Sequence, residues 1–394
     1  MEAISKQASA SAHPSERLPR IAFVGPIAEP GKPAGGGYEA ANRRTIDLLR
    51  QRGMTVLEFP YPVARGAVVR KSATYALRFA EIAGKLMWRR KDWDVLHITP
   101  HLRQFITAEN WVCQIARKLS RLVLLDIRAG SLISDYDERG AGYRREFERF
   151  IASADLLAIE GMAYAPFVRR WYNKDIFYFP NYVAHRKELK NISRQAPDQD
   201  GAIRLATVGR LVPAKGVELA IDLTEHLHRA GVRVDLEVIG TGEAAYVEHL
   251  KMRSRSLPVS FTGALPAHDI FGRLATRHFF IFATTHFGEG HSNALTEAMA
   301  LGVVPICSDN GFNREVVGNA GMVLPKTASV EMYADAVRTI ASSSGAWLSA
   351  SQAVSERVQH NFTDQIVIPQ LLDKYLRLLG NDTATSSRTL QSAA

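Results

Sequence analysis

Short apolar runs recur through both halves of the chain, and a helical pattern follows most of them. The runs show no alternation of apolar and polar residues, as expected for strands of a parallel sheet that is covered on both faces. The first unit runs from residues 20–25 through a glycine-rich loop into a helical pattern over 38–52 and a strand over 54–59. This order predicts βαβ units and an α/β fold.

The expected strands form two groups, and 394 residues allow two or three domains at ~100–200 residues each. The first group spans residues 20–25, 54–59, 95–98, 122–127 and 156–159. The second group spans residues 203–208, 234–239, 259–262, 279–283 and 304–307. A polar stretch without apolar periodicity lies between them. We therefore predict two domains, over 20–185 and 201–363, joined by a linker over 186–200. A C-terminal helix is expected over 364–380, and disordered segments are expected at the two ends, over 1–19 and 381–394.

Composition excludes several classes of protein. The two cysteines, Cys113 and Cys307, are too few for a disulfide framework or a cysteine-based zinc site, and they favour a reducing compartment. No run reaches the ~18 apolar residues that a membrane-spanning helix needs, and the first twenty residues lack the apolar region of a secretory signal. We expect a cytoplasmic protein.

The net charge of +9 is concentrated in one stretch of the first half. Residues 61–121 hold twelve basic and four acidic residues, and within them residues 71–91 show the pattern of a basic amphipathic helix. Such a helix can lie on an anionic membrane surface, which would place the protein at the inner face of the membrane. An ordinary domain helix with a charged outer face explains the same pattern. No nucleic-acid-binding motif accompanies the charge, so nucleic acid is not an expected partner.

The most specific motif begins at Glu289 and ends at Gly302, with Glu297 in the helix that follows the strand at 279–283. The free N–H groups and the positive dipole at a helix N-terminus suit a phosphate. The residues that would form this approach are Gly290, His291, Ser292 and Asn293. Ser292 or Asn293 could instead be only an N-cap, and Glu297 could simply face the surface.

Three further loops follow expected strands. Arg210 and Lys215 lie between Gly209 and Gly216, where a fork-shaped cation and a point charge suit a diphosphate. Gly240 and Gly242 follow the strand at 234–239, and Gly35, Gly36 and Gly37 precede the first helix. Each of these loops is also compatible with an ordinary charged or tight turn. The sequence has neither GxGxxG nor GxxxxGK[ST], which argues against NAD-type and P-loop sites.

These motifs, in this order, resemble the retaining family-4 glycosyltransferases (glycosyl transferases group 1), and the resemblance covers about residues 20–379. It implies the GT-B fold, in which two Rossmann-like domains face each other across a cleft. The first domain would bind the acceptor, the second would bind the nucleotide sugar, and the last helix would cross back to the first domain. No metal and no cofactor beyond the nucleotide-diphosphate sugar is implied.

The resemblance also implies a role for each motif. Arg210 and Lys215 would stabilise the leaving diphosphate, and Glu289 would contact the donor sugar, so these three residues are the catalytic candidates. Glu297 would bind the ribose. The substrate-binding candidates are Gly36, Gly37, Arg128, Gly209, Gly240, Gly242, Gly290, His291, Ser292, Asn293 and Glu297.

One position departs from the family pattern, since Arg128 stands where the family often has a histidine. Arginine cannot act as a base, but it can neutralise a phosphate or bind an acceptor. Two alternatives remain open. In one, His97 or His101 has the histidine's role; in the other, Arg128 is a structural ion-pair partner of Asp126.

The expected function is retaining transfer of a sugar from a nucleotide-diphosphate sugar to a hydroxyl on a glycan or lipid-linked acceptor. Bacterial cell-surface polysaccharide or glycolipid synthesis is the expected setting. The alternatives are a GT-B nucleotide-sugar epimerase, a sugar phosphorylase, and a non-catalytic, membrane-associated protein that binds nucleotide sugars.

Overall fold

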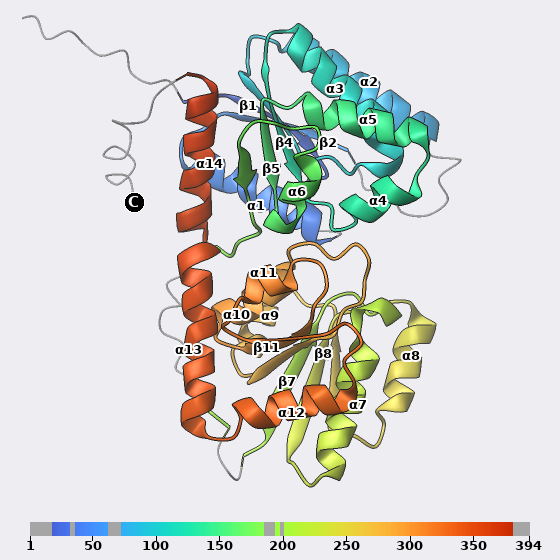
Figure 1. Ribbon diagram of the computed structural model, residues 1–394, viewed down its shortest axis with the longest axis vertical. Coiled ribbons are helices and arrows are strands. Elements are labelled where there is room, and N and C mark those ends of the chain that lie inside the picture. Colours follow the sequence, from blue (N-terminus) through green and yellow to red (C-terminus); the bar gives the residue numbers. More distant parts are fainter. Residues whose placement is uncertain (1–17, 32–35, 62–71, 185–193, 198–200, 381–394) are drawn as a thin grey trace, which may run out of the picture.

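The computed structural model describes residues 18–31, 36–61, 72–184, 194–197 and 201–380. Two domains are stacked end to end, and each contains a six-stranded parallel sheet flanked by helices (Figure 1). Residues 1–17 of the expected arm, 186–193 and 198–200 of the expected linker and the whole expected tail lie outside the described residues.

The N-terminal domain has the strand order β2-β1-β3-β4-β5-β6. Its strands are β1 Ile21–Gly25, β2 Val56–Pro60, β3 Val95–Ile98, β4 Leu122–Ile127, β5 Leu156–Ile159 and β6 Ile176–Tyr178. Its α-helices are α1 Gly37–Gln51, α2 Ser72–Trp88, α3 Ile106–Lys118, α4 Leu132–Glu138, α5 Ala141–Ala152 and α6 Ala165–Val168. Two short 3₁₀ helices, η1 Arg103–Phe105 and η2 Met162–Tyr164, precede α3 and α6.

The C-terminal domain has the strand order β12-β11-β10-β7-β8-β9. Its strands are β7 Ile203–Val208, β8 Val234–Ile239, β9 Val259–Gly263, β10 Phe279–Phe282, β11 Val304–Ser308 and β12 Met322–Leu324. Its helices are η4 Pro213–Lys215, α7 Val217–Arg229, α8 Ala244–Arg253, α9 Ala267–Leu274, α10 Asn293–Ala300, α11 Asn313–Val317 and α12 Val330–Ile340.

The strands that the sequence predicts agree with the structure to within two residues at each end. Two observed strands, β6 and β12, were not predicted. Each has three residues and lies at the edge of its sheet, with part of its length exposed to solvent. A run this short carries too little apolar pattern to be recognised, and pairing with the neighbouring strand defines it.

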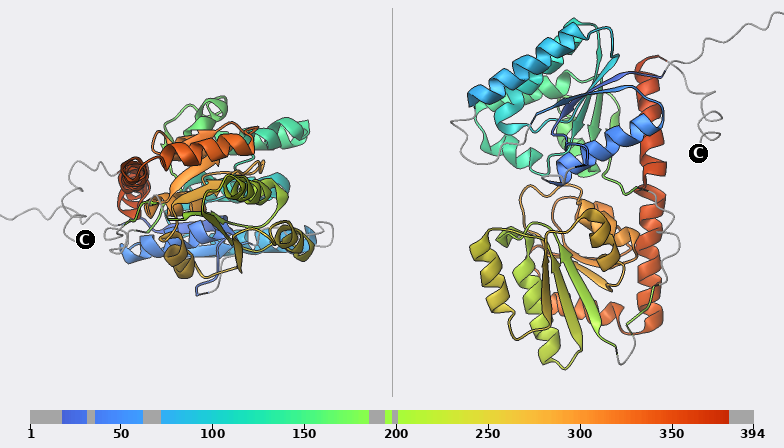
Figure 2. Two further views of the ribbon diagram at one scale, coloured as in Figure 1. Left: turned by 90° about the horizontal axis from the view of Figure 1, so that it is seen from below. Right: turned by 180° about the vertical axis from the view of Figure 1, so that it is seen from behind.

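The C-terminal helices join the two domains along one edge of the molecule (Figures 1 and 2). Helix α13, Ser344–Asn361, lies beside the C-terminal domain, and α14, Asp364–Leu378, lies beside the N-terminal domain. The buried side chains of Leu371 and Tyr375 in α14 belong to the same apolar cluster as Phe23 of β1 and Leu124 of β4. Because these residues are fully buried, α14 is part of the core of the first domain.

The two chain crossings between the domains are bonded to each other. The amide of Val183 donates to the carbonyl of Phe362 at 2.9 Å, and the amide of Asp364 donates to the carbonyl of Val183 at 3.0 Å. The outgoing and returning segments therefore cross side by side, as a two-stranded connection. Within the described residues, no helix combines the length and the apolar character that a bilayer-spanning helix requires.

Candidate functional site

Three loops of the C-terminal domain meet at the carboxyl ends of adjacent strands. The amide of Leu211, after β7, donates to the carbonyl of Thr241, after β8, at 2.9 Å. The amide of Thr285, after β10, donates to the carbonyl of Ala214 at 2.8 Å. In open parallel sheets this edge is the one that binds ligands.

Glycine is required where these loops touch. Gly240 has a φ of 143°, and a Cβ placed there would lie 1.8 Å from the carbonyl oxygen of Gly209. A Cβ on Gly242 would lie 2.0 Å from the carbonyl oxygen of Leu211. The sequence assigns Gly209, Gly240 and Gly242 to substrate binding. In the structure they also allow the backbones of neighbouring loops to pack directly against each other.

Lys215 and Glu289 form an ion pair between two of these loops. Nζ of Lys215 lies 2.5 Å from Oε2 of Glu289, and the hydroxyl of Thr284 donates to the same oxygen at 2.8 Å. The Glu289 side chain is 8% exposed and that of Lys215 is 21% exposed. Arg210, from the same loop as Lys215, is exposed. The structure therefore brings the two charged motifs of the sequence into one site.

Helix α10 begins at this site. The Oγ of Ser292, the N-cap residue, accepts the amide of Leu295 at 3.4 Å. The side-chain amide of Asn293 donates to the carbonyl of Gly37, in the other domain, at 3.2 Å. Gly37 thus lies at the domain interface beside the α10 N-terminus, and Gly36 precedes it as the N-cap residue of α1. Glu297 lies in the second turn of α10 and is partly exposed.

The His291 side chain, which the sequence predicts to bind substrate, is buried. Its Nε2 lies 2.9 Å from the hydroxyl oxygen of Thr296. Burial, together with the smaller effect of the Arg128 charge, lowers the pKa of His291 to about 3. The imidazole is therefore neutral. Only the backbone of His291 remains as a candidate for ligand binding, and its carbonyl already accepts the side-chain amide of Asn181 at 2.6 Å.

Arg128 is an ion-pair partner of Asp126, which was one of the alternatives open in the sequence. Its Nε lies 2.7 Å from Oδ2 of Asp126, its Nη1 donates to Oδ1 of Asn181 at 2.6 Å, and its Cζ lies 4.5 Å from the ring centroid of Phe179. The side chain is 3% exposed. Through Asn181, this arginine is connected to the backbone of His291 in the second domain.

The two histidines considered as alternatives differ, because His97 has two polar partners whereas the buried Nδ1 of His101 has no hydrogen-bond partner among the described residues. His97 is fully buried between Tyr375 of α14, 2.5 Å from its Nδ1, and Asp126, 3.3 Å from its Nε2. Burial lowers the pKa of His97. Burial is also the main cause of the lowered pKa of His101, and the nearby charge of Arg103 lowers it further.

The domains approach each other closely at two glycines. A Cβ on Gly130, after β4, would lie 2.3 Å from the backbone of Glu289. A Cβ on Gly290 would lie 2.0 Å from Oε1 of Glu160, a buried carboxyl directly after β5. Burial raises the pKa of Glu160 to about 8, against the opposing charge of Arg128. The carboxyl is therefore largely protonated at neutral pH.

Sequence reasoning did not assign Thr284, Asn181 or Glu160 to the site. Glu160 had a detectable signal, because it is a lone acidic residue immediately after the apolar run at 156–159. Asn181, with Pro180, is one of the motifs whose order carries the family resemblance, and Thr284 had no signal beyond its place near a strand end. In the described part of the chain, no group of three His, Cys, Asp or Glu side chains is arranged to hold a metal.

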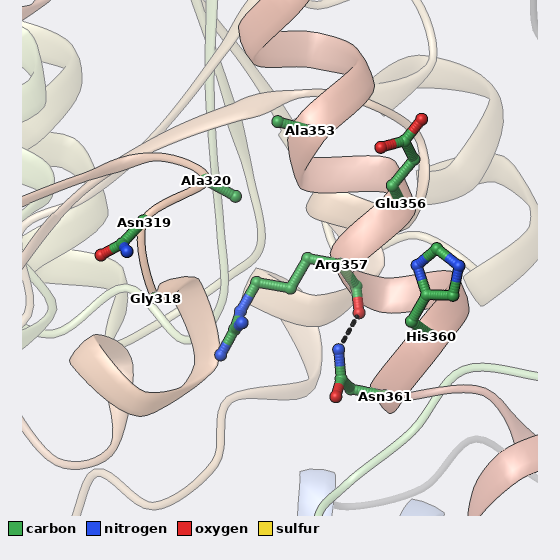
Figure 3. A pocket seen from close by; sticks show the side chains of 8 residues that line it. All are labelled: Gly318, Asn319, Ala320, Ala353, Glu356, Arg357, His360 and Asn361. Atoms are coloured by element: carbon green, nitrogen blue, oxygen red, sulfur yellow. Dashed lines mark hydrogen bonds between the residues drawn. The ribbon is translucent and has the colours of Figure 1, made fainter.

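A hollow of about 460 Å³ opens elsewhere, between α13 and the turn after α11 (Figure 3). Its central side chain, Arg357, donates to the carbonyls of Glu315 and Val316 at 2.6 Å each. The side-chain amide of Asn361 in turn donates to the carbonyl of Arg357 at 2.8 Å. None of the site residues lines this hollow, and its arginine holds the end of α11 against α13.

Comparisons with known proteins agree with this arrangement. Residues 189–358 match the family model described as glycosyl transferases group 1. The matched segment, which takes in most of the C-terminal domain, is therefore similar to that family. Protein CapJ of Staphylococcus aureus is 23% identical over 251 residues, a match that spans 60% of each chain.

Solved structures establish the fold of this chain. Sucrose-phosphate synthase from Thermosynechococcus elongatus is 16% identical with a TM-score of 0.70, and the match covers 92% of this chain and all of that one. Anabaena HepE in complex with UDP is 16% identical with a TM-score of 0.66 and the same coverage. The expected GT-B fold of two facing α/β domains is confirmed.

Proposed function

We propose that this protein is a glycosyltransferase that moves a sugar from a nucleotide-diphosphate sugar to a hydroxyl acceptor with retention of configuration and without a metal ion. The observation that carries the proposal is the Lys215–Glu289 pair in the loops that lead to α10, whose first residue Asn293 bonds to Gly37 of the other domain. HepE, which is similar in fold, has been solved with UDP and with UDP-glucose.

In the proposed mechanism the diphosphate lies against Lys215, Arg210 and the N-terminus of α10. Cations and helix N–H groups aimed at the leaving phosphate stabilise the charge that develops there. Glu289, oriented by Lys215 and Thr284, accepts hydrogen bonds from the donor sugar, and Glu297 binds the ribose. The acceptor oxygen attacks from the face that the phosphate leaves, and that phosphate takes the acceptor's proton.

We place the acceptor on a lipid at the inner face of the membrane, in bacterial polysaccharide or glycolipid synthesis. On α2, Trp88 is 82% exposed and Leu77 is 73% exposed, and Trp111 of the adjacent α3 is 48% exposed. Exposed aromatic residues among basic ones suit an anionic interface. Residue 71 of the predicted segment lies outside the described residues.

Vesicle sedimentation tests the membrane contact. Trp88→Ala is expected to weaken binding to vesicles that contain anionic lipid. Met252→Ala, a matched change at a residue that is 70% exposed in the other domain, is expected to bind like the wild type. Equal binding of wild type and Trp88→Ala to anionic vesicles contradicts this part of the proposal.

A thermal-shift screen against UDP, GDP, ADP and dTDP tests the donor site. A ligand at ~100 times its Kd adds about 2.7 kcal/mol of stability. We expect one diphosphate to raise Tm in the wild type and in Lys251→Ala, an exposed lysine, but not in Lys215→Ala. Turnover of the nucleotide sugar without an acceptor would instead indicate an epimerase, and NMR of the product gives the anomeric configuration.

A further inference from the structure

The loop after β3 holds two consecutive residues in an unfavourable backbone conformation. Leu102 has φ 59° and ψ −146°, and Arg103 has φ 53°. Among the described non-glycine residues, only Ser120 also has a positive φ. Such conformations cost roughly 1–3 kcal/mol per residue, and they persist where the surroundings impose them, often at functional sites.

Glu109, near the start of α3, imposes this conformation. Its Oε1 accepts the amide of His101 at 2.7 Å and the hydroxyl of Tyr61 at 2.6 Å, and its Oε2 accepts the amide of Leu102 at 2.9 Å. The carboxyl is fully buried, and burial raises its pKa to about 7. A buried carboxyl is costly, and this one is used to hold the loop.

The loop presents the guanidinium of Arg103 to the other domain. Its Nε donates to Asp135 at 2.8 Å and its Nη2 donates to Ser131 at 3.1 Å, which fixes its direction. Its Cζ lies 5.1 Å from the ring centroid of Phe287, which is 63% exposed and precedes Glu289 by two residues. Arg103 thus faces the segment that carries Glu289.

Positive charge from both domains converges at this point. Burial lowers the pKa of His286, and Lys215, Arg210 and Arg103 all lower it further, while Glu289 opposes them. Three cations therefore lie around this imidazole, with two carboxylates among them, Glu289 and the Asp135 that is bonded to Arg103. This excess of positive charge, with one arginine fork fixed in direction, suits a phosphate group.

We propose that Arg103 is a further substrate-binding residue, contributed by the N-terminal domain across the interface, and that it binds a phosphate group. The phosphate belongs either to the diphosphate of the donor or to a phosphorylated acceptor. The inference rests on the proposed function, since that function places the diphosphate at Lys215 and Arg210.

Calorimetric titration of wild type, Arg103→Ala, Arg103→Lys and Arg139→Ala tests the inference. Arg139 is the matched control, because it also pairs with Asp135, at 3.5 Å, but stacks on Tyr143 instead of Phe287. The first titration uses whichever of UDP, GDP, ADP or dTDP raises Tm most. The second adds inorganic phosphate to protein saturated with that diphosphate.

We expect Arg103→Ala to weaken binding at least tenfold in one titration, Arg103→Lys to weaken it less, and Arg139→Ala to stay within twofold of wild type. Loss in the first titration assigns the phosphate to the donor, and loss only in the second assigns it to the acceptor. Unchanged binding in both, or an equal loss in Arg139→Ala, overturns the inference. If Arg103→Ala does not fold, Arg103→Lys decides by the same criterion.

The failure of the proposed function is visible separately. A wild-type protein that binds none of the four diphosphates contradicts the donor site itself, and the role of Arg103 with it. If the wild type binds a diphosphate, and Arg103→Ala binds both that diphosphate and phosphate as tightly as the wild type does, only the role of Arg103 is contradicted.

Discussion

Nζ of Lys215 lies 2.5 Å from Oε2 of Glu289, although 74 residues separate them in the chain. The pair connects the loop after β7 to the loop after β10, two strands that are neighbours in the sheet. Each side chain fixes the direction of the other. A cation and a carboxylate are thereby held in one place, as the proposed binding of a nucleotide sugar requires.

Loss of either member of this pair should abolish most of the transfer activity. We expect Lys215→Ala and Glu289→Ala each to lower turnover by about 10²–10³-fold, the range seen when a single group that stabilises developing charge is removed. Because the two residues act together, the double variant should lose much less than the product of the single losses. Steady-state kinetics of the four proteins measures this, and fully multiplicative losses would contradict joint action.

The N-cap of α10 should affect ligand binding as well as stability. Ser292→Ala is expected to cost about 1 kcal/mol of unfolding free energy, the usual value of an N-cap. Ser343, whose Oγ accepts the amide of Ala346 at 3.1 Å, caps α13 in the same way and is the control. Both variants should lower Tm by a similar amount, but only Ser292→Ala should weaken diphosphate binding in calorimetry. Equal affinity in both would limit Ser292 to capping.

Removal of Arg128 should destabilise the protein strongly. Asp126 is fully buried, and Arg128→Met leaves it without its arginine, which costs about 3–5 kcal/mol for a buried pair. The double variant Asp126→Asn with Arg128→Met removes the buried charge and should recover much of the loss. Denaturant unfolding of the two proteins measures the difference. A single variant as stable as wild type would show that the pair contributes nothing to folding.

Glu160 should make stability depend on pH. Burial raises the pKa of Glu160 from 4.5 to about 8. The charge of Arg128 opposes this rise, and the charges of Asp126 and Glu289 add to it. The folded protein therefore keeps a proton that the unfolded chain releases above pH 4.5. The unfolding free energy should fall as pH rises from about 4.5 to about 8, because each pKa unit corresponds to about 1.4 kcal/mol.

Glu160→Gln, which cannot ionise, should lose less stability over the same pH range and exceed wild type at pH 8. Glu248→Gln, at a carboxyl that is 65% exposed, is the matched control and should follow the wild-type curve. Thermal unfolding at several pH values measures these slopes. Parallel curves for wild type and Glu160→Gln would contradict the proposed proton on Glu160.

The sequence alone determined the two-domain α/β architecture and the positions of the central strands, because each such strand is a continuous apolar run bounded by turns. It also identified Lys215 and Glu289, since each belongs to a local motif at a strand end. These features depend on residues that are close in the chain. A local pattern therefore suffices to recognise them.

Only the tertiary structure decided which side chains meet between the domains. Arg128 reaches the second domain through Asn181, which bonds to His291 across 110 residues, and Arg103 reaches Phe287 from a loop that Glu109 holds. No local pattern encodes such partners, since they depend on how two separately folded sheets are placed. The burial that raises the pKa of Glu160 has the same origin, because residues of both domains enclose that carboxyl.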